Sequence, residues 1–189
     1  TANSEVCPDD IAFKDSWVNR PVYLVLRAAK TRAILRAMEY AARGSQQGSN
    51  HVPSQAALSV EHVLPQSWES QDCYMVKSMT DEQRQLRNMK MHSFGNLTIL
   101  TQPLNSSISN GPFEDLTSSD GINQLGKRSQ LGQSALLINT YFQMPGLSRW
   151  DERAIDERAK ALSEAACVVW GRPYGSVSPV KVSTALTGR

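Results

Sequence analysis

SVEHVLPQSW, residues 59–68, is the stretch that decides how this chain is interpreted, because it sets a glutamate beside a histidine in an apolar run. The partly β-branched residues 59–64, followed by Pro65, predict a short strand. Side chains along a strand alternate between its two faces, so Glu61 and His62 are expected to point in opposite directions. For a lone pair of this kind, the simplest interpretation is an edge strand with Glu61 in water and His62 hydrogen-bonded in the core.

A second short strand is predicted at residues 97–100, LTIL, and it ends before Pro103. Between the two strands, Thr80 and Gln83 have the spacing of a capping box, which predicts a helix from there to about Met91. Each strand carries polar residues at one end. If the strands pair as a ribbon, these polar residues come together.

The strongest helix prediction covers residues 21–43, where Pro21 suits the first turn and Gly44 suits the position after the last turn. The polar side of this helix is rich in arginine. A solvated basic face is the simpler interpretation, and a surface that faces nucleic acid is the alternative. The apolar side is expected to consist of residues at helical spacing, namely Leu24, Ala28, Leu35, Met38 and Ala42.

Two further helices are predicted toward the C-terminus. One is expected around residues 129–142. The other is expected to begin at Ser148, with Asp151 three residues on as in a capping box. Trp150 and Trp170 flank this last helix and are expected to anchor it in the core.

Composition and pattern together predict a mainly helical α+β fold. The chain has 189 residues, 40% of them hydrophobic, which is enough for one domain with a real core. The expected organisation has four segments: an N-terminal segment with the basic helix (1–49), a core around the two strands (50–128), C-terminal helices of the same domain (129–174) and a flexible tail (175–189).

The remaining composition excludes several classes of protein. Charges are nearly balanced, with 20 basic and 18 acidic residues, so they neither demand nor exclude a nucleic-acid partner. The three cysteines form no C-x-x-C pair, which disfavours a zinc knuckle or a disulfide framework and fits a cytoplasmic setting. No apolar run is long enough for a membrane span. Since the chain begins with Thr1, we expect it to be a fragment of a longer protein.

The polar residues at the strand ends suit phosphate chemistry with a divalent metal. A neutral histidine such as His62 can take a proton from water, and a hard cation polarises the phosphate that the water attacks. Such an ion prefers carboxylate and amide oxygens, which Glu61 and Asn105 offer, with Asn110 as a less favoured substitute for the second. Asn96, at the entry to the second strand, is expected to fasten the loop through hydrogen bonds to the backbone.

Three ordered motifs resemble a known family. They are EHVLPQ, then H-x-x-G-N-L-T-I-L at residues 92–100, then N-x-x-x-x-N-x-x-F at residues 105–113. Together they closely resemble the HNH nuclease domain (ββα-metal, or His-Me finger) at the C-terminus of GmrSD-type restriction enzymes. Residues 127–128, residues 134–139 and the W-x-x-x-x-I-x-x-R of residues 150–158 resemble that family too.

The resemblance implies a role for each candidate. His62 would be the general base, Glu61 and Asn105 would bind the metal, and Asn96 would orient His62 through a backbone carbonyl. The spacing between Phe113 and Lys127 is longer than the family pattern and indicates an insertion at residues 116–126. Contacts with DNA phosphate are expected from a further set of basic residues: His92, Lys127, Arg128, Arg84 and Arg87.

The implied activity is hydrolysis of a DNA phosphodiester, as a nick or a double-strand cut, with Mg²⁺ or Mn²⁺. The resemblance also implies a role in restriction and phage defence, and a nucleotide-hydrolysing sensor domain ahead of this segment, which itself has no P-loop motif. Two rival interpretations stay open. One is a DNA-binding or regulatory module on the same fold without catalysis, and the other is a structural helical domain in which His62 and His92 are buried and hydrogen-bonded.

Overall fold

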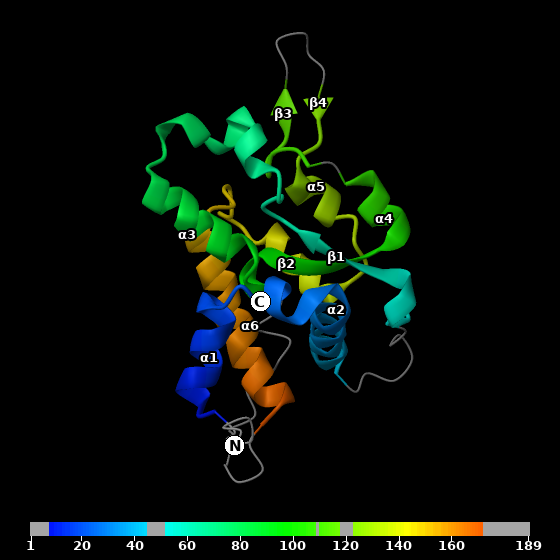
Figure 1. The fold of residues 1–189 in the computed structure, drawn as a ribbon. Helices are drawn as coiled ribbons and strands as arrows, with labels where there is room; N and C mark the ends of the chain where they lie inside the picture. The colour runs from blue at the N-terminus through cyan, green and yellow to red at the C-terminus, as the bar shows by residue number, and fades with distance from the viewer. Residues whose placement is uncertain (1–7, 45–51, 109, 118–122, 172–189) are drawn as a thin grey trace.

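The computed structural model describes residues 8–44, 52–108, 110–117 and 123–171. Within them a mainly helical chain surrounds one central two-stranded ribbon, and a second, very short strand pair stands apart from it (Figure 1). This confirms the predicted α+β class. The helices and strands are α1 (Asp10–Asn19), α2 (Val22–Arg43), β1 (Leu58–His62), α3 (Asp81–Met91), β2 (Leu97–Thr101), α4 (Gln102–Ser107), β3 (Leu116–Thr117), β4 (Asn123–Gln124), α5 (Lys127–Leu131) and α6 (Glu152–Val169), with short 3-10 turns between them.

The ribbon forms because two short β-prone runs meet in antiparallel register. His62 at the end of β1 lies opposite Leu97 at the start of β2, and Leu58 lies opposite Thr101. Helix α4 follows β2 directly, with Pro103 in its first turn, where a missing N–H costs nothing. The chain therefore makes a strand, strand and helix in the order predicted, and residue 105 lies on that helix.

Two apolar clusters hold the helices against the ribbon. One lies under α1, α2 and α6, which Figure 1 shows flanking the ribbon, and in it Trp17 stacks on Phe94 with ring centroids 4.1 Å apart. The other surrounds Trp68, Phe142 and Trp150 on the opposite side. Because β2 is buried along residues 97–100 it contributes to both clusters, so the position of the ribbon end is determined from two sides.

Gly95 explains how α6 reaches the turn that precedes β2. A Cβ atom built at Gly95 would lie 2.0 Å from the backbone oxygen of Ile155. Any side chain here would push α6 away from the turn, so the glycine is required by close approach of two backbones. Arg158, one helical turn further along, donates to the carbonyls of Gly95 and Leu97 at 2.8 Å and ties the same contact.

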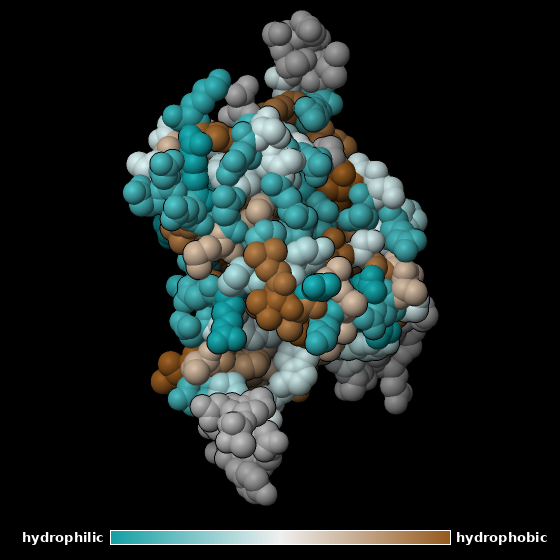
Figure 2. Space-filling view, viewed as in Figure 1, coloured by the Kyte–Doolittle hydropathy of each residue, from teal (hydrophilic) through white to brown (hydrophobic). Residues whose placement is uncertain are grey.

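Helix α2 has the predicted extent but not the predicted apolar side. Leu35, Met38 and Ala42 are buried as expected, whereas Leu24 is 61% exposed. The reason is a kink at Arg27, whose φ of 57° and ψ of 174° are not helical and turn the first helical turn away from the axis of the rest. Figure 2 shows the apolar surface that this change of direction leaves over the front of the molecule.

The predictions for the C-terminal half need correction. The single helix expected over residues 129–142 is two elements, α5 and a 3-10 helix at Leu137–Gln143, because α5 ends at Gly132. Helix α6 is capped by Asp151, whose carboxylate accepts from the N–H of Ala154, and not by Ser148. The expected insertion at residues 116–126 contains the β3–β4 pair.

The two tryptophans that flank α6 differ. Trp150 is buried as predicted, but Trp170 is 43% exposed. The tail predicted at residues 175–189 lies outside the described residues. None of the helices that are described is both long and apolar enough to cross a membrane.

Candidate active site

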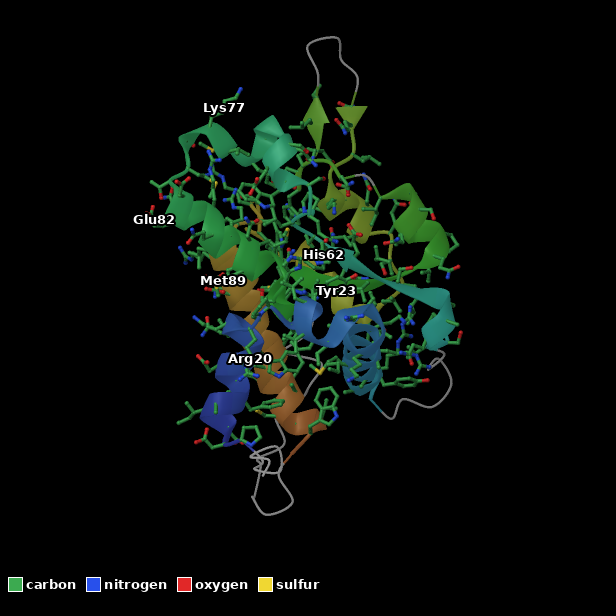
Figure 3. The ribbon with its side chains drawn as sticks, viewed as in Figure 1. Arg20, Tyr23, His62, Lys77, Glu82 and Met89 are labelled. Carbon is green, nitrogen blue, oxygen red and sulfur yellow. The ribbon has the colours of Figure 1, made fainter. Side chains whose placement is uncertain are left out.

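His62 lies at the end of β1 in a small cage of aromatic rings. Its imidazole meets the ring of Tyr23 edge-on at a centroid distance of 4.6 Å and the ring of His92 edge-on at 5.4 Å. Figure 3 shows Tyr23, in the first turn of α2, beside His62. The rings leave His62 only 5% exposed, so it is the inward-facing member of the glutamate–histidine pair.

The two ring nitrogens of His62 have different surroundings. Nδ1 lies 3.3 Å from the side-chain amide nitrogen of Gln66, whereas Nε2 is buried without a hydrogen-bond partner in the described part of the chain. Burial disfavours the imidazolium and lowers the pKa of His62 to about 3, with smaller contributions from His92 and Lys127. His62 is therefore neutral at pH 7 and has a nitrogen available to accept a proton.

Glu61 lies on the other face of β1 and is held by Lys127, the first residue of α5. The Lys127 ammonium forms an ion pair with Glu61 Oε1 and also donates to the backbone carbonyl of His62 at 2.7 Å. Lys127 is fully buried, and burial lowers its pKa although the Glu61 carboxylate works in the opposite direction. The sequence predicted a phosphate contact for Lys127, but the structure gives it these internal partners instead.

Asn96 uses all of its hydrogen-bonding capacity. Its Oδ1 accepts from the N–H of Leu64 at 2.7 Å and from Trp150 Nε1 at 2.8 Å, and its Nδ2 donates to the carbonyls of Leu64 at 3.0 Å and Met91 at 2.9 Å. These bonds fasten the segment that follows β1 to the turn before β2. The loop-fixing geometry matches the expectation, but Asn96 acts on Leu64, and the carbonyl of His62 itself is bound by Lys127.

Asn105, in contrast to Asn96, has a side-chain oxygen without a hydrogen bond among the described residues. The residue lies half-buried on α4, and this Oδ1 atom is itself buried. Buried acceptors are nearly always paired, so an unpaired one is a candidate ligand atom. Asn110, the weaker alternative, is exposed.

The available oxygens fit a sparsely ligated hard cation. Lys127 takes one carboxylate oxygen of Glu61, which leaves the second, and the unpaired Oδ1 of Asn105 adds an amide oxygen. Mg²⁺ is commonly bound by only one or two protein oxygens together with water and substrate phosphate. Within the described residues no group of three or more His, Cys, Asp or Glu side chains could hold an ion, which argues against an all-protein cage.

His92 contributes to the cage more than to the surface. It caps the C-terminal end of α3, its ring lies parallel to that of Tyr23 at 6.1 Å, and its carbonyl accepts from the N–H of Tyr23 at 3.1 Å. Its Nδ1 is buried without a partner in the residues described, and burial lowers the pKa of its imidazole. His92 thus anchors the start of α2 next to His62.

The arginines that were predicted to contact phosphate are engaged inside the protein. Arg84 donates to the carbonyl of Val76 at 3.1 Å. Arg87 pairs with Glu152 and lies 4.9 Å above the ring of Trp68. The third, Arg128, donates to the carbonyl of Phe142, inside the 3-10 helix, and to that of Met144, just after it, both at 3.2 Å.

The basic side of α2 divides into two groups. Arg32 and Arg36 donate to the backbone carbonyls of Leu58 and Pro53, at 3.2 and 2.8 Å, and so hold the start of β1. The exposed basic residues lie ahead of α2, at the kink and just after it: Arg20, Arg27 and Lys30. Arg20 is at the start of this stretch in Figure 3, below Tyr23 and His62.

Two contributors to the site were not predicted. Gln66 lies within the opening motif, and its spacing of four residues from His62 was the available signal. Tyr23 has no such signal, because it reaches His62 only when α2 packs against the ribbon.

Comparison with protein families matches residues 7–165 to the C-terminal domain of the GmrSD restriction endonucleases. The chain belongs to this family. The GmrSD match extends over most of the chain and includes every candidate site residue, from Tyr23 on α2 to Arg128 on α5. Separate comparisons with curated proteins and with solved structures found no match. Membership in the GmrSD family assigns the chain to the nuclease domains of restriction systems.

Proposed function

We propose that this domain is a metal-dependent DNA endonuclease of the HNH type, in which His62 is the general base and Glu61 and Asn105 bind one divalent cation. The observation that carries the proposal is the end of the ribbon. There a neutral histidine with an unpartnered Nε2 adjoins a carboxylate with one oxygen to spare, while α4, which follows the other end of β2, carries an unpaired amide oxygen.

His62 performs the proton transfer in this proposal. Burial keeps the imidazole neutral but also makes it a weak base, so in this proposal it takes a proton from the attacking water once Nε2 is hydrated. Only one nitrogen of a neutral imidazole is an acceptor. The Gln66 amide group faces Nδ1, and with the proton on Nδ1 and the amide turned so that its oxygen accepts from it, Gln66 stabilises the tautomer in which Nε2 is the base.

Glu61 and Asn105 supply the oxygens for Mg²⁺ or Mn²⁺. When bound, such a cation neutralises phosphate charge and stabilises the leaving oxygen. Lys127 binds one oxygen of Glu61 from the protein side, so the second oxygen of the carboxylate is the one left for the cation. Asn96 and Trp150 keep the segment after His62 in place while DNA binds and leaves.

The enclosure of His62 sets a condition on this chemistry, because water has to reach Nε2. Tyr23 belongs to a single helical turn ahead of Arg27, whose positive φ is costly for a residue other than glycine. Movement of this turn would relieve the backbone strain at Arg27 and expose His62 at the same time. The exposed Arg20, Arg27 and Lys30 flank the turn and are the cations best placed to meet DNA phosphates there.

The test is conversion of supercoiled plasmid to nicked or linear DNA with Mg²⁺, with Mn²⁺ and with EDTA. We expect cutting by the wild-type chain to require metal, and His62→Ala to lose about 10²–10⁴-fold in rate while remaining folded by circular dichroism. Cutting that persists in His62→Ala, or in EDTA, would contradict the assignment. A plasmid that carries modified bases serves as a second substrate.

A DNA-binding or regulatory module without catalysis is the second candidate. The observations that favour it are the near-complete burial of His62 and the ion pair that occupies Glu61. Such a module would shift labelled DNA in a salt-dependent manner but would neither cut it nor be stabilised by Mn²⁺. A thermal melt with and without Mn²⁺ therefore separates the two candidates even when plain plasmid is a poor substrate.

A further inference from the structure

Lys127 and Lys90 are the two buried lysines among the described residues, and they have different kinds of partner. Lys90 is 8% exposed and joins helices, since its ammonium bonds the carbonyl of Val18, the side chain of Asn19 and the carboxylate of Asp156. Lys127 is 0% exposed, and both of its recorded partners belong to adjacent candidate site residues. Burying an ammonium is costly unless its bonds are used, so each lysine needs a reason to be inside.

The position of Lys127 is set by the backbone around it. Its N–H donates to the carbonyl of Pro112 at 2.9 Å, and the N–H of Arg128 donates to that of Phe113 at 2.8 Å. Just before it, the N–H of Gly126 donates to Asp115 Oδ1 at 2.7 Å. A Cβ atom at Gly126 would lie 2.2 Å from the carbonyl carbon of Glu114, so the two segments touch closely. The chain therefore enters and leaves the insertion at neighbouring positions. These contacts fix the backbone from which the Lys127 side chain extends into the site.

Building on the proposed function, we propose that Lys127 is the positioning residue of the site. One ammonium joins the carboxylate of Glu61 to the carbonyl of His62, although the two side chains point to opposite faces of β1. This bond sets which Glu61 oxygen is turned outward for the cation, and it holds the peptide that carries the His62 ring. Carboxylate ligands of metals commonly need such hydrogen-bonded support.

A direct phosphate contact is the competing role for Lys127, and the geometry speaks against it. The side chain has no exposed surface, and its ammonium already donates to two oxygens of β1. To reach a phosphate it would have to leave Glu61 as a half-buried carboxylate without its partner. Lys127 therefore acts on DNA through Glu61 and His62.

The experiment measures Mn²⁺ affinity without DNA, by calorimetric titration of the whole chain and of Lys127→Met. Methionine keeps the apolar stem and removes the charge, and we expect its Mn²⁺ affinity to fall about 10–100-fold. An unchanged affinity would overturn the proposal. A higher affinity would overturn it as well, because it would mean that the ammonium competes with the cation. If Lys127→Met does not fold, Lys127→Gln, which removes the charge but keeps an N–H donor, takes its place, with a smaller loss of Mn²⁺ affinity expected.

Lys90→Met is the matched control. It removes a second buried lysine with a carbonyl and a carboxylate partner, so we expect a similar fall in the unfolding midpoint but an unchanged Mn²⁺ affinity. Equal affinity losses in both variants would mean that Lys127 has only a general structural role.

A salt series completes the test. Loss of a direct phosphate contact would lower the salt dependence of DNA binding, d log K/d log[salt], by about one. Our proposal predicts that this slope is the same in Lys127→Met and in the wild type. A weaker salt dependence in the variant would overturn the proposal. The proposed function is judged separately on the wild-type chain: if that chain neither binds Mn²⁺ nor cuts plasmid, both proposals fail, whereas a failure confined to Lys127→Met overturns only the positioning role.

Discussion

Two asparagines nine residues apart, Asn96 and Asn105, have opposite surroundings. Asn96 is fully buried and makes four hydrogen bonds, which join the turn before β2 to the segment after β1 and to Trp150. Asn105 is half-buried, and its side-chain oxygen has no partner among the described residues. The same side chain thus holds the scaffold in one place and offers a free acceptor in the other.

The difference shows where the protein keeps a feature that lowers its folding stability. A buried polar atom without a partner costs about 1–3 kcal/mol of folding stability, so folding alone would select against it. Two such atoms lie at the end of the ribbon, namely Nε2 of His62 and Nδ1 of His92, and a third, Oδ1 of Asn105, lies on the helix that follows β2. We interpret them as atoms that await water, cation or substrate, whereas the saturated bonds of Asn96 keep the site in shape.

The largest effect is expected at the saturated residue. Asn96→Ala leaves the N–H groups of Leu64 and Trp150 and two carbonyls without partners, so it should lower the free energy of unfolding by about 3 kcal/mol. Urea denaturation followed by tryptophan fluorescence measures this. Asn96→Asp keeps the two accepted bonds but sets a buried carboxylate oxygen against the carbonyls of Leu64 and Met91, so it should cost at least as much. If the free energy of unfolding fell by less than it does for an average exposed substitution, the contrast between Asn96 and Asn105 would be wrong.

Asn105→Ala should have the reverse profile. Because it deletes an unpaired oxygen, the midpoint of unfolding should stay the same or rise slightly. Activity should fall by about 10–100-fold at low Mn²⁺ and recover in part at high Mn²⁺, as expected for a weakened metal site. If the loss does not depend on metal concentration, Asn105 is not a ligand, and Asn110→Ala becomes the next variant to measure.

The histidine cage predicts a pH dependence of stability. The folded pKa of His62 is about 3, while the unfolded chain takes up a proton near 6.5, so the unfolded state is favoured as pH falls from 6.5 toward 3. Between pH 6.5 and 5 this amounts to a loss of about 2 kcal/mol. His62→Ala should flatten this part of the curve, measured by urea denaturation at each pH. Curves that stay parallel would show that His62 is not the residue responsible.

The smallest effect is expected from Gln66. Gln66→Ala removes the amide that selects the His62 tautomer, so we expect about a tenfold lower rate with little change in unfolding midpoint or Mn²⁺ affinity. Gln66→Glu keeps an acceptor for Nδ1–H and should retain more activity than alanine. If alanine and glutamate variants cut equally well, the tautomer is set by another group.

Local signals in the sequence were sufficient for several elements of the fold. Thr80 and Gln83 form the predicted capping box, and β1 and β2 lie where the β-prone runs predict them. Helix α2 ends at Gly44 as predicted, with a positive φ of 63°. These features depend on bonds and side-chain periodicity within a few residues, and the chain itself specifies such contacts.

Only the tertiary structure decided how the site is enclosed and supported. No spacing rule relates Tyr23 to His62, or Lys127 to Glu61, and these residues meet because α2 and α5 pack against the ribbon from different directions. The same packing exposed Leu24 and turned Arg84, Arg87 and Arg128 toward internal partners. The sequence by itself determined which residues could do the chemistry and on which elements they lie. Which of their atoms are paired, buried or free depends on desolvation and long-range contacts, and these exist only in the folded chain.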